Sequence, residues 1–330
     1  MASKKIRVIA FGLGPIGSGI ARVVAAREGF TIVGAVDIDP AKAGKDVGSV
    51  IGFDHPMGVP VSGDAAHVLK KKADVVIHST GSVLTQVEPQ LAAIIRARHN
   101  IVSTCEELSQ PWTHGPVAKR IDALAKKFGV TVLGTGINPG FMMDTLPILL
   151  TGVCQQVSCV RVRRVVDASK RRLPLQKKIG TGLTVDEFKA KAAKKEIRHV
   201  GLTESVALVA RTLNWKLDKI EETIEPVVAS TSVKTEYFEV APGFVTGVRQ
   251  FGYGIQNGRR VIELDLKMCV DAGESVDEVW LEGKPEIHSV IHGVHGDLST
   301  AAVAANSIRR VVAAPPGLAT MADIPIISVA

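Results

Sequence analysis

Short apolar runs alternate with longer amphipathic segments in the first part of the chain. The runs are rich in Val and Ile and have the length of buried strands; they lie at 6–10, 30–36, 74–79, 100–104 and 130–133. Apolar residues recur at helical spacing between them, and the expected helices are 15–28, 88–99 and 117–128. Since strands that alternate with helices form βαβ units, we predict an α/β domain with a doubly wound parallel sheet.

The pattern changes after about residue 159. Residues 160–166 alternate apolar and basic side chains, as a strand with one exposed face does. Further strands are expected at 227–232, 245–254, 260–270 and 288–291, and further helices at 203–213 and 299–312. This indicates a second, α+β domain with a mixed or antiparallel sheet. We place the domains at 1–140 and 141–298, with a C-terminal helix and tail at 299–330 that returns to the first domain.

Composition limits the classes of protein to consider. The chain has 330 residues, 46% hydrophobic and only 4% aromatic, which is typical of a globular protein with a buried parallel sheet. No apolar run reaches the roughly 18 residues of a membrane span. No signal peptide is evident, and the four scattered Cys are expected to be reduced thiols in a cytoplasmic protein. The irregular spacing of His288, His292 and His295 does not indicate a metal site.

The net charge of +7 is concentrated between Arg161 and Arg198. An anion site is one reading of this basic stretch, and a solvated helix face is the other. Residues 184–199 have the pattern of an amphipathic helix, and aromatic residues that could stack on bases are missing. We therefore expect no nucleic-acid partner and no membrane partner.

A glycine motif follows the first strand and opens the first helix. It reads G-x-G-x-x-G and comprises Gly12, Leu13, Gly14, Pro15, Ile16 and Gly17. In this context the glycines permit a tight turn, close approach of a diphosphate, and close helix packing, so the first domain is expected to be a dinucleotide-binding Rossmann domain. Asp37 follows the second strand and can accept hydrogen bonds from a ribose, which favours NAD; NADP is kept as the alternative cofactor, and Asp39 as the alternative ribose ligand.

Longer motifs resemble one enzyme family over nearly the whole chain. The stretches are "STCEELSQPW", "GTGINPGFMMDTLP", "VRRVVDASKRR" and "HGDLSTAAVAANSI". They are similar to 2,4-diaminopentanoate dehydrogenases and related amine dehydrogenases, within the wider dihydrodipicolinate reductase-like superfamily. The resemblance implies NAD(P)-dependent conversion of a primary amine to a ketone or aldehyde plus ammonia, reversible as reductive amination. It also implies a homodimer formed through a substrate-binding second domain.

Four strand ends of the first domain are expected at one edge of the sheet, where ligands of such folds bind. The glycine turn is one, and Ser79, Thr80 and Gly81 form a second that can line the cofactor with backbone. Asn138 lies in a rigid turn and can meet the nicotinamide or the substrate, or it can satisfy its own backbone.

The remaining strand end carries two acids, Glu106 and Glu107. Deamination needs a base, because hydride leaves only from the carbon of a neutral amine, and a carboxylate also stabilises an iminium cation. The family's catalytic Glu corresponds to this pair. We expect Glu106 to be the acid/base and keep Glu107 as the second choice, since an acid in a first helical turn also complements the helix dipole.

The substrate side is defined by fewer residues. Arg164 can meet a carboxylate on the substrate or be an exposed strand residue, and Phe141 and Met142 can wall an apolar pocket or belong to the core. Two further readings stay open. One is an imine reductase of the dihydrodipicolinate type, although its K-x-D-x-P-S-G-T segment is missing here; the other is a nucleotide-binding sensor without turnover.

Overall fold

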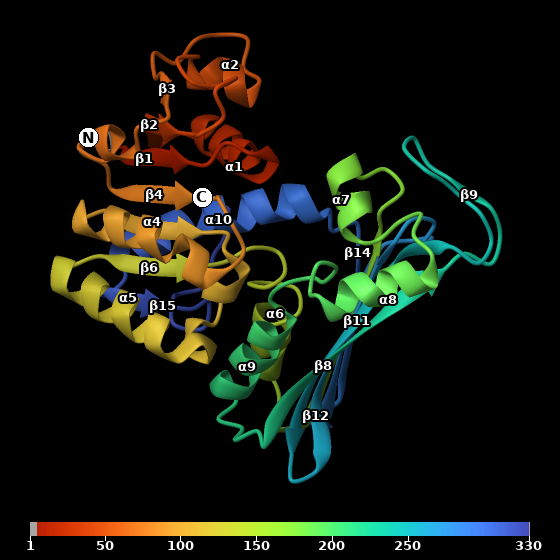
Figure 1. The fold of residues 1–330 in the computed structure, drawn as a ribbon. Helices are drawn as coiled ribbons and strands as arrows, with labels where there is room; N and C mark the ends of the chain where they lie inside the picture. The colour runs from red at the N-terminus through yellow and green to blue at the C-terminus, as the bar shows by residue number, and fades with distance from the viewer. Residues whose placement is uncertain (1–4, 330) are drawn as a thin grey trace. The chain divides into compact units, whose positions relative to one another are not determined.

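The computed structural model describes residues 5–329 of the chain. These residues form two compact units: the first combines the described residues up to Phe141 with those from His295 onward, and the second is Met142–Val294. Each unit has its own sheet and its own core. Figure 1 shows the elements of both units in the order of the chain.

A seven-stranded parallel sheet forms the centre of the first unit, with the strand order β15-β6-β5-β4-β1-β2-β3. Its strands are β1 (Ile6–Phe11), β2 (Phe30–Val36), β3 (Val61–Ser62), β4 (Val75–His78), β5 (Asn100–Ser103), β6 (Thr131–Gly134) and β15 (Gly317–Ala319). Strand order reverses between β1 and β4, because β1 pairs with β2 on one side and with β4 on the other. This reversal is the switch point at which parallel nucleotide-binding sheets hold ligands.

Helices cover both faces of this sheet (Figure 1). They are α1 (Pro15–Ala25), α2 (Val47–Ile51), α3 (Ala65–Val68), α4 (Leu84–Arg96), α5 (Gly115–Phe128) and α10 (Gly296–Ala313), with the short 3-10 turns Glu106–Leu108 and Pro111–His114. Helix α1 contacts α10, and α4 contacts α5. Fully buried Ile and Leu side chains of α4 and β5 join one apolar core with β1 and β6. The predicted doubly wound α/β fold is confirmed.

The second unit is built on a six-stranded sheet of order β14-β13-β7-β12-β11-β8. Its strands are β7 (Gln156–Asp167), β8 (Lys219–Val228), β11 (Val245–Gln256), β12 (Arg259–Cys269), β13 (Val276–Lys284) and β14 (Ile287–His292), with a small ribbon of β9 (Val233–Lys234) and β10 (Glu239–Val240). Only β7 and β12 pair in parallel within this sheet, so it is mixed, as predicted.

One face of the second sheet carries helices. They are α6 (Thr145–Thr151), α7 (Leu173–Lys178), α8 (Val185–Ala193) and α9 (Leu202–Thr212). Helix α9 contacts β8, β11 and β12, and a capping box formed by Thr184 and Glu187 begins α8. The other face bears the alternating basic residues of β7, because Arg161 and Arg163 are exposed while Val160 and Val162 are buried.

One expectation about the strands was wrong, and two strands had not been predicted. The strand predicted at 227–232 overlaps β8 only at residues 227 and 228, because β8 begins at Lys219 in a run of charged residues and ends at Val228. Strand β13 had not been predicted. The Pro-rich tail adds β15 to the edge of the parallel sheet, where it pairs with β6. Because β15 is short and follows two prolines, its local pattern does not distinguish it from a loop.

Candidate active site

The glycine motif forms the turn between β1 and α1. Gly12 has φ of +91°, which favours glycine, and Pro15 is the first residue of the helix, where its missing N–H costs nothing. A Cβ on Gly17 would lie 1.9 Å from the carbonyl oxygen of Gly12. A Cβ on Gly14 would meet nothing within 4 Å. Gly17 is therefore required for packing, whereas Gly14 faces open space that a diphosphate can fill.

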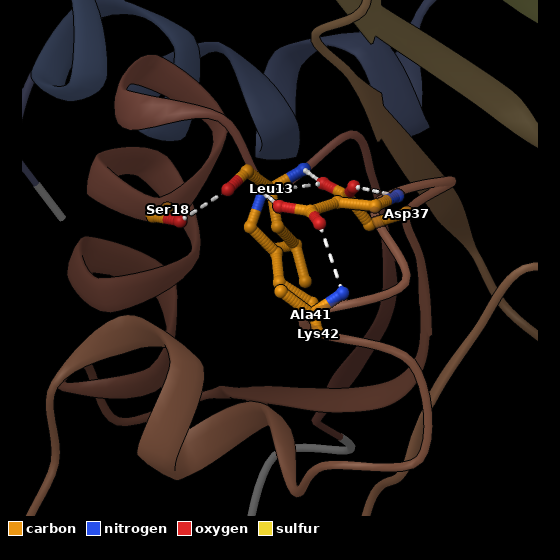
Figure 2. A network of polar contacts seen from close by, with 6 residues as sticks. Leu13, Ser18, Asp37, Ala41 and Lys42 are labelled. Carbon is orange, nitrogen blue, oxygen red and sulfur yellow. Dashed lines mark hydrogen bonds and ion pairs between the residues drawn. The ribbon is translucent and has the colours of Figure 1, made fainter.

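Asp37, which follows β2, bonds to the backbone of the glycine turn between β1 and α1 (Figure 2). Its Oδ2 accepts from the backbone N–H of Leu13 at 2.7 Å, and its Oδ1 accepts from the N–H of Asp39 at 2.9 Å. The Lys42 ammonium lies 3.2 Å from Asp37 Oδ2 and 3.4 Å from Asp39 Oδ2. Burial alone would raise the pKa of Asp37, but these backbone and lysine contacts outweigh it and lower the pKa below its ordinary value. Asp37 is therefore ionised and held in place.

The end of β4 lies against the glycine turn. A Cβ on Gly12 would stand 2.5 Å from the carbonyl oxygen of Ser79 and 3.0 Å from the Thr80 side chain. The hydroxyl of Ser79 is buried without a hydrogen-bond partner. Gly81 has only Val87 near its absent Cβ. This strand end is thus close enough to the turn to line a bound dinucleotide with Ser79 and with backbone.

Asn138 lies in the turn after β6. Its side chain is buried, and neither its Nδ2 nor its Oδ1 has a hydrogen-bond partner. The Oγ1 of Thr135, which precedes this turn, is also buried without a partner. The Asn138–Pro139 peptide is cis, and Gly140 has φ of +126°. The reading in which Asn138 satisfies its own backbone is therefore excluded, and its amide is left for another group.

The two acids after β5 have different surroundings. Glu107 is 8% exposed, and its Oε2 accepts from the backbone N–H of Leu84 at 2.7 Å, the first residue of α4. Glu107 therefore complements the N-terminus of another helix rather than of its own turn. Glu106 is only partly buried and begins the 3-10 turn. Burial, with the charge of Glu106, raises the pKa of the neighbouring Cys105 thiol to about 12, so this thiol stays protonated.

The residues of the first unit fit a dinucleotide. An open space at Gly14, an ionised Asp37 at the end of β2 and buried unpartnered polar atoms of Ser79, Thr135 and Asn138 all belong to the carboxyl ends of neighbouring strands. Unsatisfied buried polar groups are rare in native proteins, and a ligand is a usual explanation for them.

The substrate residues expected in the second unit are less open to a ligand. The Arg164 side chain is 3% exposed, and its Nη1 donates to Asp277 Oδ1 at 2.5 Å. It is therefore neither exposed nor without a counter-charge. Met142 is buried, and Phe141 is partly exposed; the boundary between the two units falls between them.

The remaining histidines do not gather around an ion. No cluster of three metal-ligating side chains occurs within residues 5–329. His288 stacks on Trp280 with ring centroids 4.8 Å apart, and His292 lies 2.8 Å from Glu274. Among residues 5–329, no helix is long and apolar enough to cross a bilayer.

Two residues of this edge had not been predicted. Lys42 lies five positions after Asp37 and His78 ends the apolar strand β4. A polar residue at the end of a buried strand is a signal that could have identified His78. The pairing of Lys42 depends on the path of a loop, which no local pattern specifies.

Comparisons with known proteins agree with this geometry. Residues 141–330 match the family described as the 2,4-diaminopentanoate dehydrogenase C-terminal domain, and residues 6–107 match the dihydrodipicolinate reductase N-terminus. The chain is 35% identical to a 2,4-diaminopentanoate dehydrogenase of Acetoanaerobium sticklandii, covering 98% of this chain and 94% of that protein. It is 27% identical to an amine dehydrogenase of Streptomyces virginiae over 97% of this chain and 96% of that protein.

A solved amine dehydrogenase from Mycobacterium smegmatis has the same architecture. The TM-score is 0.89 at 26% identity, with 100% of this chain and 98% of that chain covered. A dihydrodipicolinate reductase from Paenisporosarcina has a TM-score of 0.54 at 13% identity, over 96% and 97% of the two chains, which shows a shared fold only. The match of the C-terminal family over more than half of the chain agrees with the whole-length relative. The chain belongs to the 2,4-diaminopentanoate dehydrogenase family.

Proposed function

We propose that this protein is an NAD(P)-dependent amine dehydrogenase that deaminates a primary amine to a ketone or aldehyde plus ammonia, with Glu106 as the acid/base. The observation that carries the proposal is the position of Glu106. It follows β5, between the β4 end that lines the glycine turn and the β6 end that bears the unpartnered Asn138. The family to which the chain belongs supports the reaction class.

A nicotinamide held at these strand ends would supply the acceptor for the hydride of the amine carbon. Glu106 first takes a proton from the substrate ammonium, because only the neutral amine can lose a hydride, and then passes this proton to solvent, which restores the carboxylate. Its negative charge then stabilises the iminium cation of the substrate. The carboxylate next orients and deprotonates the attacking water, and finally returns a proton to the departing ammonia. One partly buried carboxylate can perform these steps in turn.

For the cofactor, we propose NAD with NADP as a second option. Asp37 is ionised and would repel a 2′-phosphate, but the Lys42 ammonium lies within 3.4 Å of both Asp37 and Asp39. The loop therefore carries a cation that offsets one of its two carboxylates. The buried amide of Asn138 is suited to the carboxamide of a nicotinamide or to a polar group of the substrate.

For the substrate, we propose an amine similar to 2,4-diaminopentanoate. The relative from Acetoanaerobium sticklandii bears that substrate in its name. Phe141 and Met142 follow the Asn138 turn directly and are the residues proposed for the apolar part of the substrate site. Arg164 is proposed as a ligand of the substrate carboxylate only if Asp277 releases it, because the two side chains are paired.

We further propose a homodimer that forms through the exposed face of the second unit's sheet. A shallow groove on this face is lined by side chains of both charges and by aromatic rings: Arg161, Arg163, Phe251, Tyr253, Glu263, Asp265 and Trp280. Since the face carries both signs of charge, a second copy related by a two-fold axis can match it. The four free cysteines fit the reducing cytoplasm, which we propose as the location.

A screen of NADH oxidation with and without ammonia tests this function. The protein is offered a panel of ketones and aldehydes and 2-amino-4-oxopentanoate, and the reverse reaction is followed with 2,4-diaminopentanoate and NAD+. Ammonia-dependent NADH oxidation is expected. Oxidation of NADH with a cyclic imine and no ammonia would indicate an imine reductase, and cofactor binding without any turnover would indicate a sensor.

A further inference from the structure

His78 is a fully buried histidine that the proposed chemistry does not use. It ends β4, and its side chain is 0% exposed. Its Nδ1 lies 2.8 Å from the Ser103 hydroxyl, and its Nε2 lies 2.8 Å from Gln90 Oε1. The Thr80 hydroxyl also donates to Gln90 Oε1 at 2.5 Å. A buried imidazole thus connects the end of β4 with α4 and with the end of β5.

The partners of His78 determine where its proton lies. Gln90 is oriented with its Oε1 facing the ring, and an amide oxygen can only accept, so in this orientation Nε2 carries the proton and Nδ1 is the acceptor. The Thr80 hydroxyl lies 2.9 Å from the same Nε2 and can accept from it, because its own proton goes to Gln90 Oε1. The Ser103 hydroxyl therefore donates to Nδ1, and its oxygen remains free to accept the backbone N–H of Cys105 at 3.1 Å. Burial lowers the pKa of His78 to about 4, so the imidazole is neutral near neutral pH.

The residues on both sides of Glu106 are fixed by such contacts. Cys105 donates its N–H to Ser103, which is bonded to His78. Glu107 donates its N–H to the Ser82 carbonyl at 3.2 Å and binds the α4 terminus through its carboxylate. In addition, the Thr104 N–H donates to the carbonyl of His78 at 3.0 Å. The segment 104–107 is therefore held to the β4 end and to α4, with Glu106 between two anchored neighbours.

From this we infer that His78 is a positioning residue, which fixes the Cys105–Glu107 segment through Ser103 and so holds the carboxylate of Glu106 in the geometry needed for deamination. The inference rests on the proposed function. A catalytic group displaced by about 1 Å can lose about 100-fold in rate, so a buried anchor that acts through Ser103, three residues before the base, has a measurable effect. Gln90 and Thr80 both contact Nε2 of the imidazole and so orient the ring with its acceptor facing Ser103.

Two substitutions separate the two sides of the imidazole. In His78→Asn the amide oxygen lies near the position of Nδ1 and can still accept from Ser103. In His78→Gln the amide lies near the position of Nε2, so the contact with Gln90 is kept and the one with Ser103 is lost. Ser103→Ala removes the same contact from the other partner. His99→Gln is the matched control, because His99 is also buried but bonds the carbonyls of Leu69 and Ala73, before β4 begins.

We expect kcat for 2,4-diaminopentanoate with NAD+ to fall about 10- to 100-fold in His78→Gln and in Ser103→Ala, and less than about threefold in His78→Asn. The double variant His78→Gln/Ser103→Ala should lose no more than either single variant, since both remove one contact. The Kd of NAD+, measured by fluorescence, should change little. His99→Gln should lower stability without lowering kcat.

Backbone hydrogen exchange gives a readout that needs no turnover. The amides of 104–107 should exchange faster in His78→Gln and Ser103→Ala than in His78→Asn and in His99→Gln. Equal losses of kcat in His78→Asn and His78→Gln, additive losses in the double variant, or unchanged exchange in 104–107 would each overturn the inference. If the wild type shows no deamination, the proposed function fails, whereas the exchange measurement still decides whether His78 anchors this segment.

Discussion

At the scale of single residues, buried polar atoms without partners mark the candidate site. Asn138 buries both atoms of its amide, and Ser79 and Thr135 bury hydroxyl oxygens, all at the carboxyl ends of β4 and β6. Leaving such groups unpaired costs about 1–3 kcal/mol each. A ligand that pairs with them removes this cost, which is why the same atoms that weaken the empty protein can strengthen binding of a nicotinamide.

The Lys42 ammonium beside Asp37 and Asp39 predicts how the protein discriminates between NADP+ and NAD+. Lys42→Ala removes the cation beside Asp37 and Asp39, so a 2′-phosphate would meet two carboxylates with no compensation. We expect the Kd of NADP+ to rise at least about tenfold relative to that of NAD+. Fluorescence titration with both cofactors measures this ratio. Lys45→Ala is the control, because Lys45 is exposed and close in sequence. An equal change for both cofactors would contradict the role of Lys42.

His78 also predicts how stability depends on pH. Its pKa is lowered from 6.5 to about 4, so below pH 6.5 the unfolded chain binds a proton that the folded protein does not. Stability is therefore lost as pH falls from about 6.5 towards 4, and this one group contributes a loss of about 2 kcal/mol between pH 7 and pH 5. Urea unfolding at both pH values should show a smaller loss in His78→Asn than in the wild type. Parallel losses would mean that His78 titrates normally.

At the scale of elements, the turn between β1 and α1 separates packing from binding. Gly17→Ala would place a Cβ 1.9 Å from the backbone oxygen of Gly12, so it should lower the melting temperature strongly. Gly14→Ala meets no neighbouring atom and keeps an ordinary φ of −63°, so it should melt like the wild type. Its methyl group, however, would enter the space expected for the diphosphate, and the Kd of NAD+ should rise at least about tenfold. Unchanged affinity in Gly14→Ala would show that the diphosphate lies elsewhere.

Elements with strong periodicity were predictable, and those defined by distant partners were not. Helix α9 begins one residue before its predicted start, and β4 lies within its predicted range, because their apolar residues repeat at the spacing of each structure. Strand β15 has no such repeat and owes its place to β6. The same limit applies to the site. The positions of Asp37 and Asn138 after strands could be predicted from the sequence. The helix that Glu107 complements could not, because it is determined by tertiary packing.

At the scale of the whole molecule, the exposed face of the second sheet is the feature that most needs an explanation. Phe251 and Tyr253 stack on each other, Arg249 and Arg260 lie over their rings, and Trp280 is partly exposed beside Arg161. Aromatic and arginine residues are enriched at protein interfaces. A second copy of the chain would cover these rings and pair the charges around them.

The proposed dimer predicts a mass in solution that can be measured. Light scattering after size-exclusion chromatography should give twice the chain mass for the wild type. Trp280→Glu places a charge in the middle of the face and should shift the mass towards that of a single chain. The control Trp112→Glu changes an exposed tryptophan of the first unit and should leave the mass unchanged. A wild type with the mass of one chain, or a Trp280→Glu variant that stays paired, would contradict this dimer.

The most direct test of the central claim is the turnover of Glu106→Gln compared with Glu107→Gln. Amine oxidation by NAD+ is measured for both variants at saturating substrate, together with the Kd of NAD+. We expect Glu106→Gln to bind NAD+ as the wild type does and to lose about 10²- to 10⁴-fold in kcat, because an amide cannot carry the protons. Glu107→Gln should unfold at a lower urea concentration but still turn over. Near-normal turnover in Glu106→Gln, or an equal loss in Glu107→Gln, would contradict the role of Glu106 as the acid/base.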